Sequence, residues 1–243
     1  QMCIRDRSYM VQNSKKPIVI TGSQRPLAAV DSDARSNLLN AIVFACDSRA
    51  HGVHLLFDNK VILGTRARKT HTKSFNAFKS IDFPEIAIVR DRRVRYYIEE
   101  KVSDDGPDFY TSLDPKVFVL RLVPGMNPDI FSFLKEHYDG LVIESFGVGG
   151  IPCYDNEDFI DAVADWIACG KALVMTTQVP HEGSDMSVYM VGQVIKKKYR
   201  LMEAYDMTTE AIVTKLMWIL AQTKNPDEVR ELFYRPVQND LNI

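Results

Sequence analysis

A short polar stretch that follows a predicted strand is the first place in this sequence where chemistry could occur. Residues 18–20 form an unbroken β-branched run, which is typical of a strand buried on both faces. The segment TGSQ at positions 21–24 ends this run with small and polar residues. In open α/β sheets ligands bind outside the carboxyl ends of strands, so residues 21–24 are candidate ligand contacts. A purely structural connection between strand and helix is the alternative interpretation.

Other reactive side chains lack a spacing that would define a site by itself. Lys69 lies in a basic stretch with Arg66 and Arg68, and a run of charges is usually a solvated surface. The histidines show neither HxxxH nor HExxH spacing, so a metal site is not expected. The GVGG segment at 147–150 lacks the Lys-Ser/Thr of a phosphate-binding loop, and we interpret it as a tight turn.

The elements that must position these residues follow from hydrophobic spacing. In the first half we expect a helix over residues 33–45, capped by Asp31, Ser32 or Asp33, and a loop or broken helix over residues 64–78. Strands are expected where β-branched and aliphatic residues cluster, and the first two are joined by a hairpin turn. These strands cover residues 52–57, 61–63, 86–89 and 94–98.

The second half alternates strands and helices, which indicates parallel βαβ units. Its predicted strands cover residues 117–123, 140–143 and 172–175. Its predicted helices cover residues 128–138, 156–169, 209–222 and 226–233. Gly170 is placed as the C′ residue that ends the second of these helices.

Both ends of the first half are irregular. The opening QMCIRDR fits neither a signal peptide nor a helix that continues into Ser8, so we interpret residues 1–7 as a non-native scar. Residues 8–13 are typical of the end of a helix, which Pro17 stops. Apolar periodicity stops again over residues 101–115, where Asp, Gly and Pro accumulate, and this segment is predicted to be a linker between two domains.

Composition narrows the class of protein. The 243 residues are 46% hydrophobic and 26% charged, as in ordinary soluble globular proteins. A net charge of −2, from 30 basic and 32 acidic residues, argues against a nucleic-acid or membrane partner. No apolar run approaches the ~20 residues of a membrane span, and the four scattered cysteines indicate reduced thiols in a cytoplasmic protein.

Five spaced motifs resemble those of the bacterial type I (cytoplasmic) L-asparaginases. In chain order they are TGSQRP, SDARSN, GTRARKTHTKSFNAF, ESFGVGGIP and TTQVPHEGSDM, and the resemblance covers almost the whole chain from about Ser8. It implies an α/β fold: the remainder of a doubly wound, Rossmann-like sheet domain over residues 8–100, and a smaller, flavodoxin-like three-layer α/β domain over residues 116–243. It also implies hydrolysis of L-asparagine to L-aspartate and ammonia, without metal or cofactor, in homodimers and dimers of dimers.

The resemblance also implies roles for particular residues. Lys69 occupies the position of the family's triad lysine, whose ammonium holds the nucleophilic threonine or a water in place within a Thr–Lys–Asp arrangement. Ser23 and Gln24 occupy the loop that contacts the side-chain amide of the substrate, mainly through backbone carbonyl groups. Asp33 and Asn37 are expected to fix this loop and the start of the helix rather than to act as catalysts.

Two motifs of the family are absent from the sequence. The family's nucleophilic threonine lies in a TGGT-type segment, and its second threonine and its aspartate lie together in an HGTDT-type segment. Neither segment occurs here, and the resemblance implies that both would lie before Ser8. We therefore expect an N-terminally truncated L-asparaginase that is catalytically inactive on its own.

Two positions depart from the enterobacterial type I pattern. Glu144 stands where those relatives have an arginine that helps to bind a second, regulatory asparagine, and Val179 stands in place of a cysteine. A glutamate cannot clamp a carboxylate as an arginine does. We therefore predict that this chain lacks the regulatory asparagine site.

Two alternative functions remain open. One is the amidase subunit of a tRNA-dependent amidotransferase, which uses the same amidase domain to release ammonia. The other is a non-catalytic module that binds small amino acids on the same scaffold, because fold alone does not determine function. The preference for asparagine over glutamine is also open, since one methylene is discriminated by the shape of the pocket.

Overall fold

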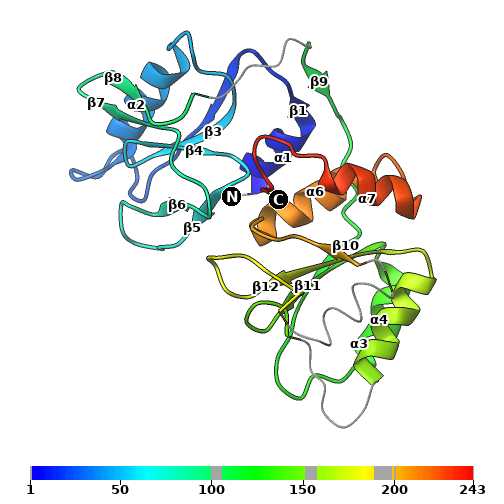
Figure 1. Ribbon diagram of the computed structural model, residues 1–243. Coiled ribbons are helices and arrows are strands. Elements are labelled where there is room, and N and C mark those ends of the chain that lie inside the picture. Colours follow the sequence, from blue (N-terminus) through cyan, green and yellow to red (C-terminus); the bar gives the residue numbers. More distant parts are fainter. Residues whose placement is uncertain (1, 100–105, 151–157, 189–198, 200, 243) are drawn as a thin grey trace. The chain divides into compact units, whose positions relative to one another are not determined.

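The chain forms two compact units in the computed structural model (Figure 1), which describes residues 2–99, 106–150, 158–188, 199 and 201–242. Unit 1 comprises Gln1–Thr111 together with Val237–Asp240, and unit 2 comprises Ser112–Pro236 together with Leu241–Ile243. Each unit combines helices with a β-sheet, so the prediction of a two-domain α/β protein is confirmed.

Unit 1 is built on a five-stranded mixed sheet. Its strands, in spatial order, are β2 (Pro17–Ile20), β3 (Gly52–Phe57), β4 (Lys60–Leu63), β7 (Ala87–Arg90) and β8 (Arg93–Tyr96). β2 and β3 are parallel and are joined through helix α2 (Ala34–Ala45), while the other neighbouring strands are antiparallel. Unit 1 therefore contains one βαβ unit, whose second strand also begins the predicted β3–β4 hairpin.

The buried face of helix α2 does not contain its larger aliphatic residues. Its buried residues are Asn37, Ala41 and Phe44, which follow the i, i+4, i+7 spacing of a single helix face. Phe44 packs in a cluster with Leu56 of β3. The larger aliphatic residues of α2 lie on its other faces and are exposed to solvent: Leu38, Leu39 and Ile42.

A small two-stranded sheet in unit 1 carries the lysine singled out above. β5 (Ala67–Lys69) pairs antiparallel with β6 (Phe78–Ser80). The prediction that residues 64–78 form a loop or broken helix is therefore wrong at residues 67–69 and 78, which are paired, whereas residues 70–77 do form a loop. The basic residues suggested a solvated surface, yet Arg66 is fully buried and its Nε donates a hydrogen bond to the Asn239 carbonyl at 2.6 Å.

The first residues of the chain form helix α1 (Met2–Met10), which is followed by strand β1 (Val11–Gln12). The expectation that residues 1–7 do not continue as a helix into Ser8 is wrong, because α1 runs through both and buries Ile4 in a cluster of unit 1. The helix also ends earlier than the predicted residue 13. β1 pairs with β9 (Asp108–Phe109), inside the segment predicted to be a linker.

Unit 2 is built on a four-stranded parallel sheet, as the alternating pattern predicts. Its strands are β10 (Val117–Arg121), β11 (Gly140–Ser145), β12 (Ala172–Thr177) and β13 (Met202–Glu203). Its helices are α3 (Ile130–His137), α4 (Asp158–Ala168), α6 (Thr209–Leu220) and α7 (Pro226–Tyr234). α3 and α4 lie on one face of the sheet and α6 on the other, which gives three layers (Figure 1).

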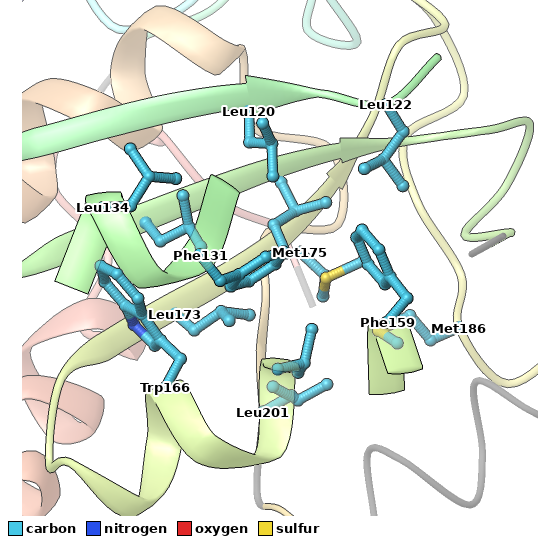
Figure 2. Packing of buried hydrophobic residues seen from close by; sticks show 13 residues of the cluster. Leu120, Leu122, Phe131, Leu134, Phe159, Trp166, Leu173, Met175, Met186 and Leu201 are labelled. Atoms are coloured by element: carbon cyan, nitrogen blue, oxygen red, sulfur yellow. The ribbon is translucent and has the colours of Figure 1, made fainter. Parts of the chain in front are cut away.

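The main core of unit 2 lies between the sheet and helices α3 and α4 (Figure 2). Leu141 and Ile143 of β11 belong to this cluster, whereas the intervening Val142, also buried, does not, as expected for the alternating faces of a strand. Phe131 and Phe159 meet edge to face with ring centroids 5.3 Å apart. The cluster also contains Leu120, Leu122, Leu134, Val163, Trp166, Leu173 and Met175.

Helix ends in unit 2 follow the local sequence. Gly170 has φ of 72°, in the left-handed region, and thus follows α4 as the predicted C′ residue. The side-chain oxygen of Thr208 accepts a hydrogen bond from Ala211 N at 3.2 Å and caps α6. Asn225 caps α7 in the same way. The predicted helix over residues 156–169 begins outside the described residues, and α4 is its described part.

Candidate functional site

The loop after β2 is held on both sides by hydrogen bonds within unit 1. The Thr21 hydroxyl donates to the Leu56 carbonyl of β3 at 2.8 Å. The Asn37 Nδ2 group of helix α2 donates to the Gly22 carbonyl at 2.9 Å, and Asn37 Oδ1 accepts from Asp58 N at 3.1 Å. Asn37 therefore ties the loop at the carboxyl end of β2 to the β3–β4 turn.

The Asp33 carboxylate accepts hydrogen bonds from three donors in and next to this loop. Its carboxylate accepts hydrogen bonds from the backbone N–H groups of Gln24 at 3.0 Å and Arg25 at 3.1 Å. It also accepts from Asn37 Nδ2 at 3.1 Å. Asp33 makes no cap hydrogen bond to its own helix, where Ser32 Oγ instead accepts from the backbone N–H of Ala34 at 3.1 Å. The expected role of Asp33 in fixing the loop is thus visible in its contacts.

Lys69 and Gln24, which are 45 residues apart in sequence, are in direct contact. The Lys69 Nζ atom donates to Gln24 Oε1 at 3.1 Å, and Gln24 Nε2 donates to the Ser74 carbonyl at 2.9 Å. Lys69 is half-buried, and its ammonium lies 5.8 Å from the centroid of the Phe78 ring. Ser23 lies in the same loop with an exposed side chain. Two of the three predicted site residues are therefore joined by a hydrogen bond.

Sequence reasoning missed the residues of the β5–β6 loop. Ser74 contributes its carbonyl to Gln24, and the Arg25 guanidinium lies 5.5 Å from the centroid of the Phe75 ring. Ser74 and Phe75 lie within the motif GTRARKTHTKSFNAF, but the polar residues between Lys69 and Phe78 do not by themselves indicate these contacts. A cavity of about 240 Å³ lies beside the loop. Its lining is mostly polar and includes Asp31, Ser32, Asp33, Asn37, Asp58 and Phe75.

This arrangement can hold a polar ligand through a cation and through backbone groups. The Lys69 ammonium is a donor for carboxylate, carbonyl or hydroxyl oxygens, and the loop backbone offers carbonyl acceptors. Within the described parts of the chain, no three His, Cys, Asp or Glu side chains are grouped so that they could hold a metal ion. The Lys69 ammonium and the loop backbone can stabilise charge and position a ligand.

The carboxyl end of the sheet in unit 2 carries a separate polar cluster. Glu144 is buried, its Oε1 accepts from the Thr209 hydroxyl at 2.7 Å, and its Oε2 lies 4.0 Å from Arg121 Nη1. The neighbouring segment 147–150 turns sharply, because Gly150 N donates to the Phe146 carbonyl at 2.7 Å. The two carboxylate oxygens of Glu144 thus both contact residues of unit 2.

Two tyrosines of unit 1, Tyr9 and Tyr96, have raised pKa values. Burial raises the pKa of Tyr9 well above its ordinary range, and the Asp240 carboxylate, which accepts the Tyr9 hydroxyl at 2.9 Å, adds to this effect. Burial and then the nearby Asp47 carboxylate raise the pKa of Tyr96 to about 12. The hydrogen bond from Arg49 lowers the pKa of Asp47.

Comparison with known proteins gives matches to both units. The family model "Asparaginase, N-terminal" matches residues 7–102, and the model "Glutaminase/Asparaginase C-terminal domain" matches residues 116–233. An L-asparaginase of Thermococcus kodakarensis is 37% identical over 234 residues, which cover 96% of this chain and 70% of that protein.

A solved structure and a second class of relative extend the comparison. The thermostable L-asparaginase from Thermococcus kodakarensis matches with a TM-score of 0.94 and 35% identity, covering 99% of this chain and 72% of that one. A glutamyl-tRNA(Gln) amidotransferase subunit of Thermofilum pendens is 34% identical over 237 residues, which cover 93% of this chain and 51% of that protein.

Among the described residues, none of the helices is both long and apolar enough to cross a membrane.

Proposed function

The chain belongs to the asparaginase family, and on that premise we propose that it is a cytoplasmic, type I L-asparaginase that hydrolyses L-asparagine to L-aspartate and ammonia. Relatives named L-asparaginase support an amidohydrolase. The observation that carries the finer proposal is the hydrogen bond between Lys69 and Gln24, because it joins the position of the family's lysine to the loop expected to contact the substrate.

The proposed reaction is an acyl transfer through a threonine. The threonine hydroxyl adds to the side-chain amide carbon, the C–N bond breaks, and ammonia leaves with the proton of the hydroxyl. Water then cleaves the ester and releases L-aspartate. We assign to the Lys69 ammonium the task of holding the threonine or the water, and to the backbone carbonyls of Ser23 and Gln24 the recognition of the substrate amide.

The threonines of this mechanism are not among the residues of this sequence, since neither the TGGT-type nor the HGTDT-type segment occurs in it. The match covers 70% of the Thermococcus kodakarensis relative, and we propose that both threonines and the aspartate correspond to the part of that relative outside the match. On this account the chain is inactive by itself, since a lone lysine does not replace a missing nucleophile. We also propose that the active protein is a homodimer or a dimer of dimers.

The test is ammonia release from L-asparagine by two proteins. One is this chain, and the other is a chimera in which any residues that precede the match in the Thermococcus kodakarensis relative are joined ahead of this chain. We expect ammonia from the chimera and none from the chain. Ammonia from the chain alone would contradict the account of the nucleophile. Absence of activity in a folded chimera that still binds L-asparagine would favour a non-catalytic binding module.

A second candidate is the amidase subunit of a tRNA-dependent amidotransferase. The specific observation in its favour is the 34% identity to the glutamyl-tRNA(Gln) amidotransferase protein of Thermofilum pendens. The same chimera separates the two functions, because a free asparaginase releases ammonia from L-asparagine without any tRNA. Ammonia release that requires glutamine and a charged tRNA would favour the amidotransferase.

A further inference from the structure

The side-chain amide of Gln24 can satisfy its two partners in only one orientation. A lysine ammonium has donors and no acceptor, and a backbone carbonyl has an acceptor and no donor. Gln24 must therefore turn Oε1 toward Lys69 and Nε2 toward the Ser74 carbonyl, as it does at 3.1 and 2.9 Å. A rotated amide would lose both hydrogen bonds, so the position of the Gln24 side chain fixes one acceptor for the Lys69 ammonium.

The backbone of Gln24 is fixed in turn by Asp33. Both carboxylate oxygens lie 3.0 Å from Gln24 N, and one of them also accepts from Arg25 N at 3.1 Å. Hydrogen bonds to an ionised acceptor are about twice as strong as neutral ones. The carboxylate is itself oriented by Asn37, which is only 2% exposed and lies one turn further along α2. Asn37 of helix α2 therefore orients the carboxylate that holds the backbone of Gln24.

We propose that Asp33 is a positioning residue for Lys69 and that it acts through Gln24. The inference rests on the proposed function, in which the Lys69 ammonium must meet a threonine or a water. A lysine side chain has several rotatable bonds, and restricting it before the substrate binds removes part of the entropy cost of a productive geometry. Asp33 supplies this restriction from a distance, because it contacts Gln24 and not the lysine.

The consequence is a measurable protection of the Lys69 amine in this chain. A lysine side chain held against Gln24 Oε1 has less freedom to turn its nitrogen toward an acylating reagent, so the contact should slow acylation of Lys69. The test is competitive labelling of the folded chain with trace acetic anhydride, read at each lysine by mass spectrometry from about pH 7 to about pH 10. Lys79, which is exposed on the neighbouring strand β6, serves as the internal reference.

Asp33→Asn is the informative variant, because it keeps the shape of the side chain but turns an amide donor toward a cluster of donors. We expect the labelling of Lys69 relative to Lys79 to rise by about tenfold, the size of one charged hydrogen bond. Asp31→Asn is the matched control: Asp31 has the same charge, lies in the same loop and pairs with exposed Arg25. It should leave the ratio unchanged.

A second set of variants separates positioning from general loosening of the fold. Gln24→Ala should raise the labelling of Lys69 by a similar factor, and Gln24→Glu, which keeps an acceptor for the ammonium, should restore protection. In the Gln24→Ala background, Asp33→Asn should not increase the labelling of Lys69 any further, because the Gln24 side chain that links the two residues is absent. A further increase in that background, or an unchanged ratio in Asp33→Asn, would overturn the proposal. Since no turnover is needed, failure here is distinct from failure of the proposed function.

Discussion

At the scale of single residues, the burial of Tyr96 close to the Asp47 carboxylate makes unit 1 sensitive to alkaline pH. The Arg49 guanidinium lies 4.2 Å from the centroid of the Tyr96 ring and also pairs with Asp47, with Nε to Oδ1 at 3.1 Å. Burial and the Asp47 carboxylate raise the pKa of Tyr96 from 10.0 to about 12. The folded protein therefore keeps the Tyr96 proton at pH values where the unfolded chain loses it.

This difference predicts the pH dependence of stability. Because the folded pKa is raised, the contribution of Tyr96 is complete below pH 10 and is lost as the pH rises to about 12. Tyr96→Phe should flatten the fall of the urea midpoint in that window. Tyr97→Phe, at a side chain that is 63% exposed, is the control and should keep the wild-type slope. Equal slopes in Tyr96→Phe and the wild type would contradict the assignment.

The candidate site could be predicted from the sequence only in part. The motifs identified Lys69 and Gln24 as candidate site residues, and the two side chains are in contact. The hydrogen bond from Gln24 to the Ser74 carbonyl could not be predicted, because it depends on the pairing of β5 with β6. That pairing was not predicted, because the segment is rich in polar residues. The three donors around Asp33 were equally hidden, since they depend on the path of the loop rather than on the spacing of residues.

At the scale of elements, the ends of helices are where the sequence was most informative. A glycine after the last periodic residue predicted the end of α4, and Gly170 has the left-handed φ of 72° that this position requires. By contrast, β5 was missed because Arg66 suggested solvent exposure. The residue is in fact buried and its Nε donates to the Asn239 carbonyl, a contact that hydrophobic patterning cannot predict.

The same glycine gives a prediction for unit 2. Gly170→Ala should lower the free energy of unfolding by about 1 kcal/mol, because alanine is strained at positive φ. Gly170→Asn should cost less, since asparagine tolerates the left-handed region. No neighbouring atom lies within 4 Å of a Cβ built at Gly170, so a steric clash would not explain the loss. Urea denaturation of the three proteins checks the order, and an alanine variant as stable as the wild type would contradict it.

At the scale of the whole molecule, the chain returns to unit 1 near its C-terminus. Asp240 is fully buried in unit 1, where it accepts hydrogen bonds from the Tyr9 hydroxyl at 2.9 Å and from Val237 N at 2.8 Å. The Thr65 hydroxyl donates to the Gln238 carbonyl at 2.8 Å. Residues from both ends of the sequence thus stabilise one unit, which a division of the sequence into two successive domains does not anticipate.

Because residues near the C-terminus pack in unit 1, a substitution at Asp240 should affect segments of unit 1 that are far from it in sequence. Asp240→Asn should speed amide hydrogen exchange in β5 and in the segment around Tyr9 by about tenfold, through weakening of a buried charged hydrogen bond. Exchange in β11 of unit 2 should not change. Asp108→Asn is the control, since that carboxylate is exposed and accepts from Asn13 Nδ2 at 2.9 Å. Equal acceleration in both units would show that the segment does not act on unit 1 in particular.

On the proposed function, Lys69 serves the hydrolysis of L-asparagine. The most direct measurement is kcat/KM for L-asparagine in the chimera described above, with Lys69→Ala compared with Lys79→Ala. We predict a loss on the order of 10³-fold for Lys69→Ala, the size expected when one electrostatic contact of a transition state is removed, and no significant loss for Lys79→Ala. An active chimera whose Lys69→Ala variant keeps its kcat/KM within about tenfold would contradict the account.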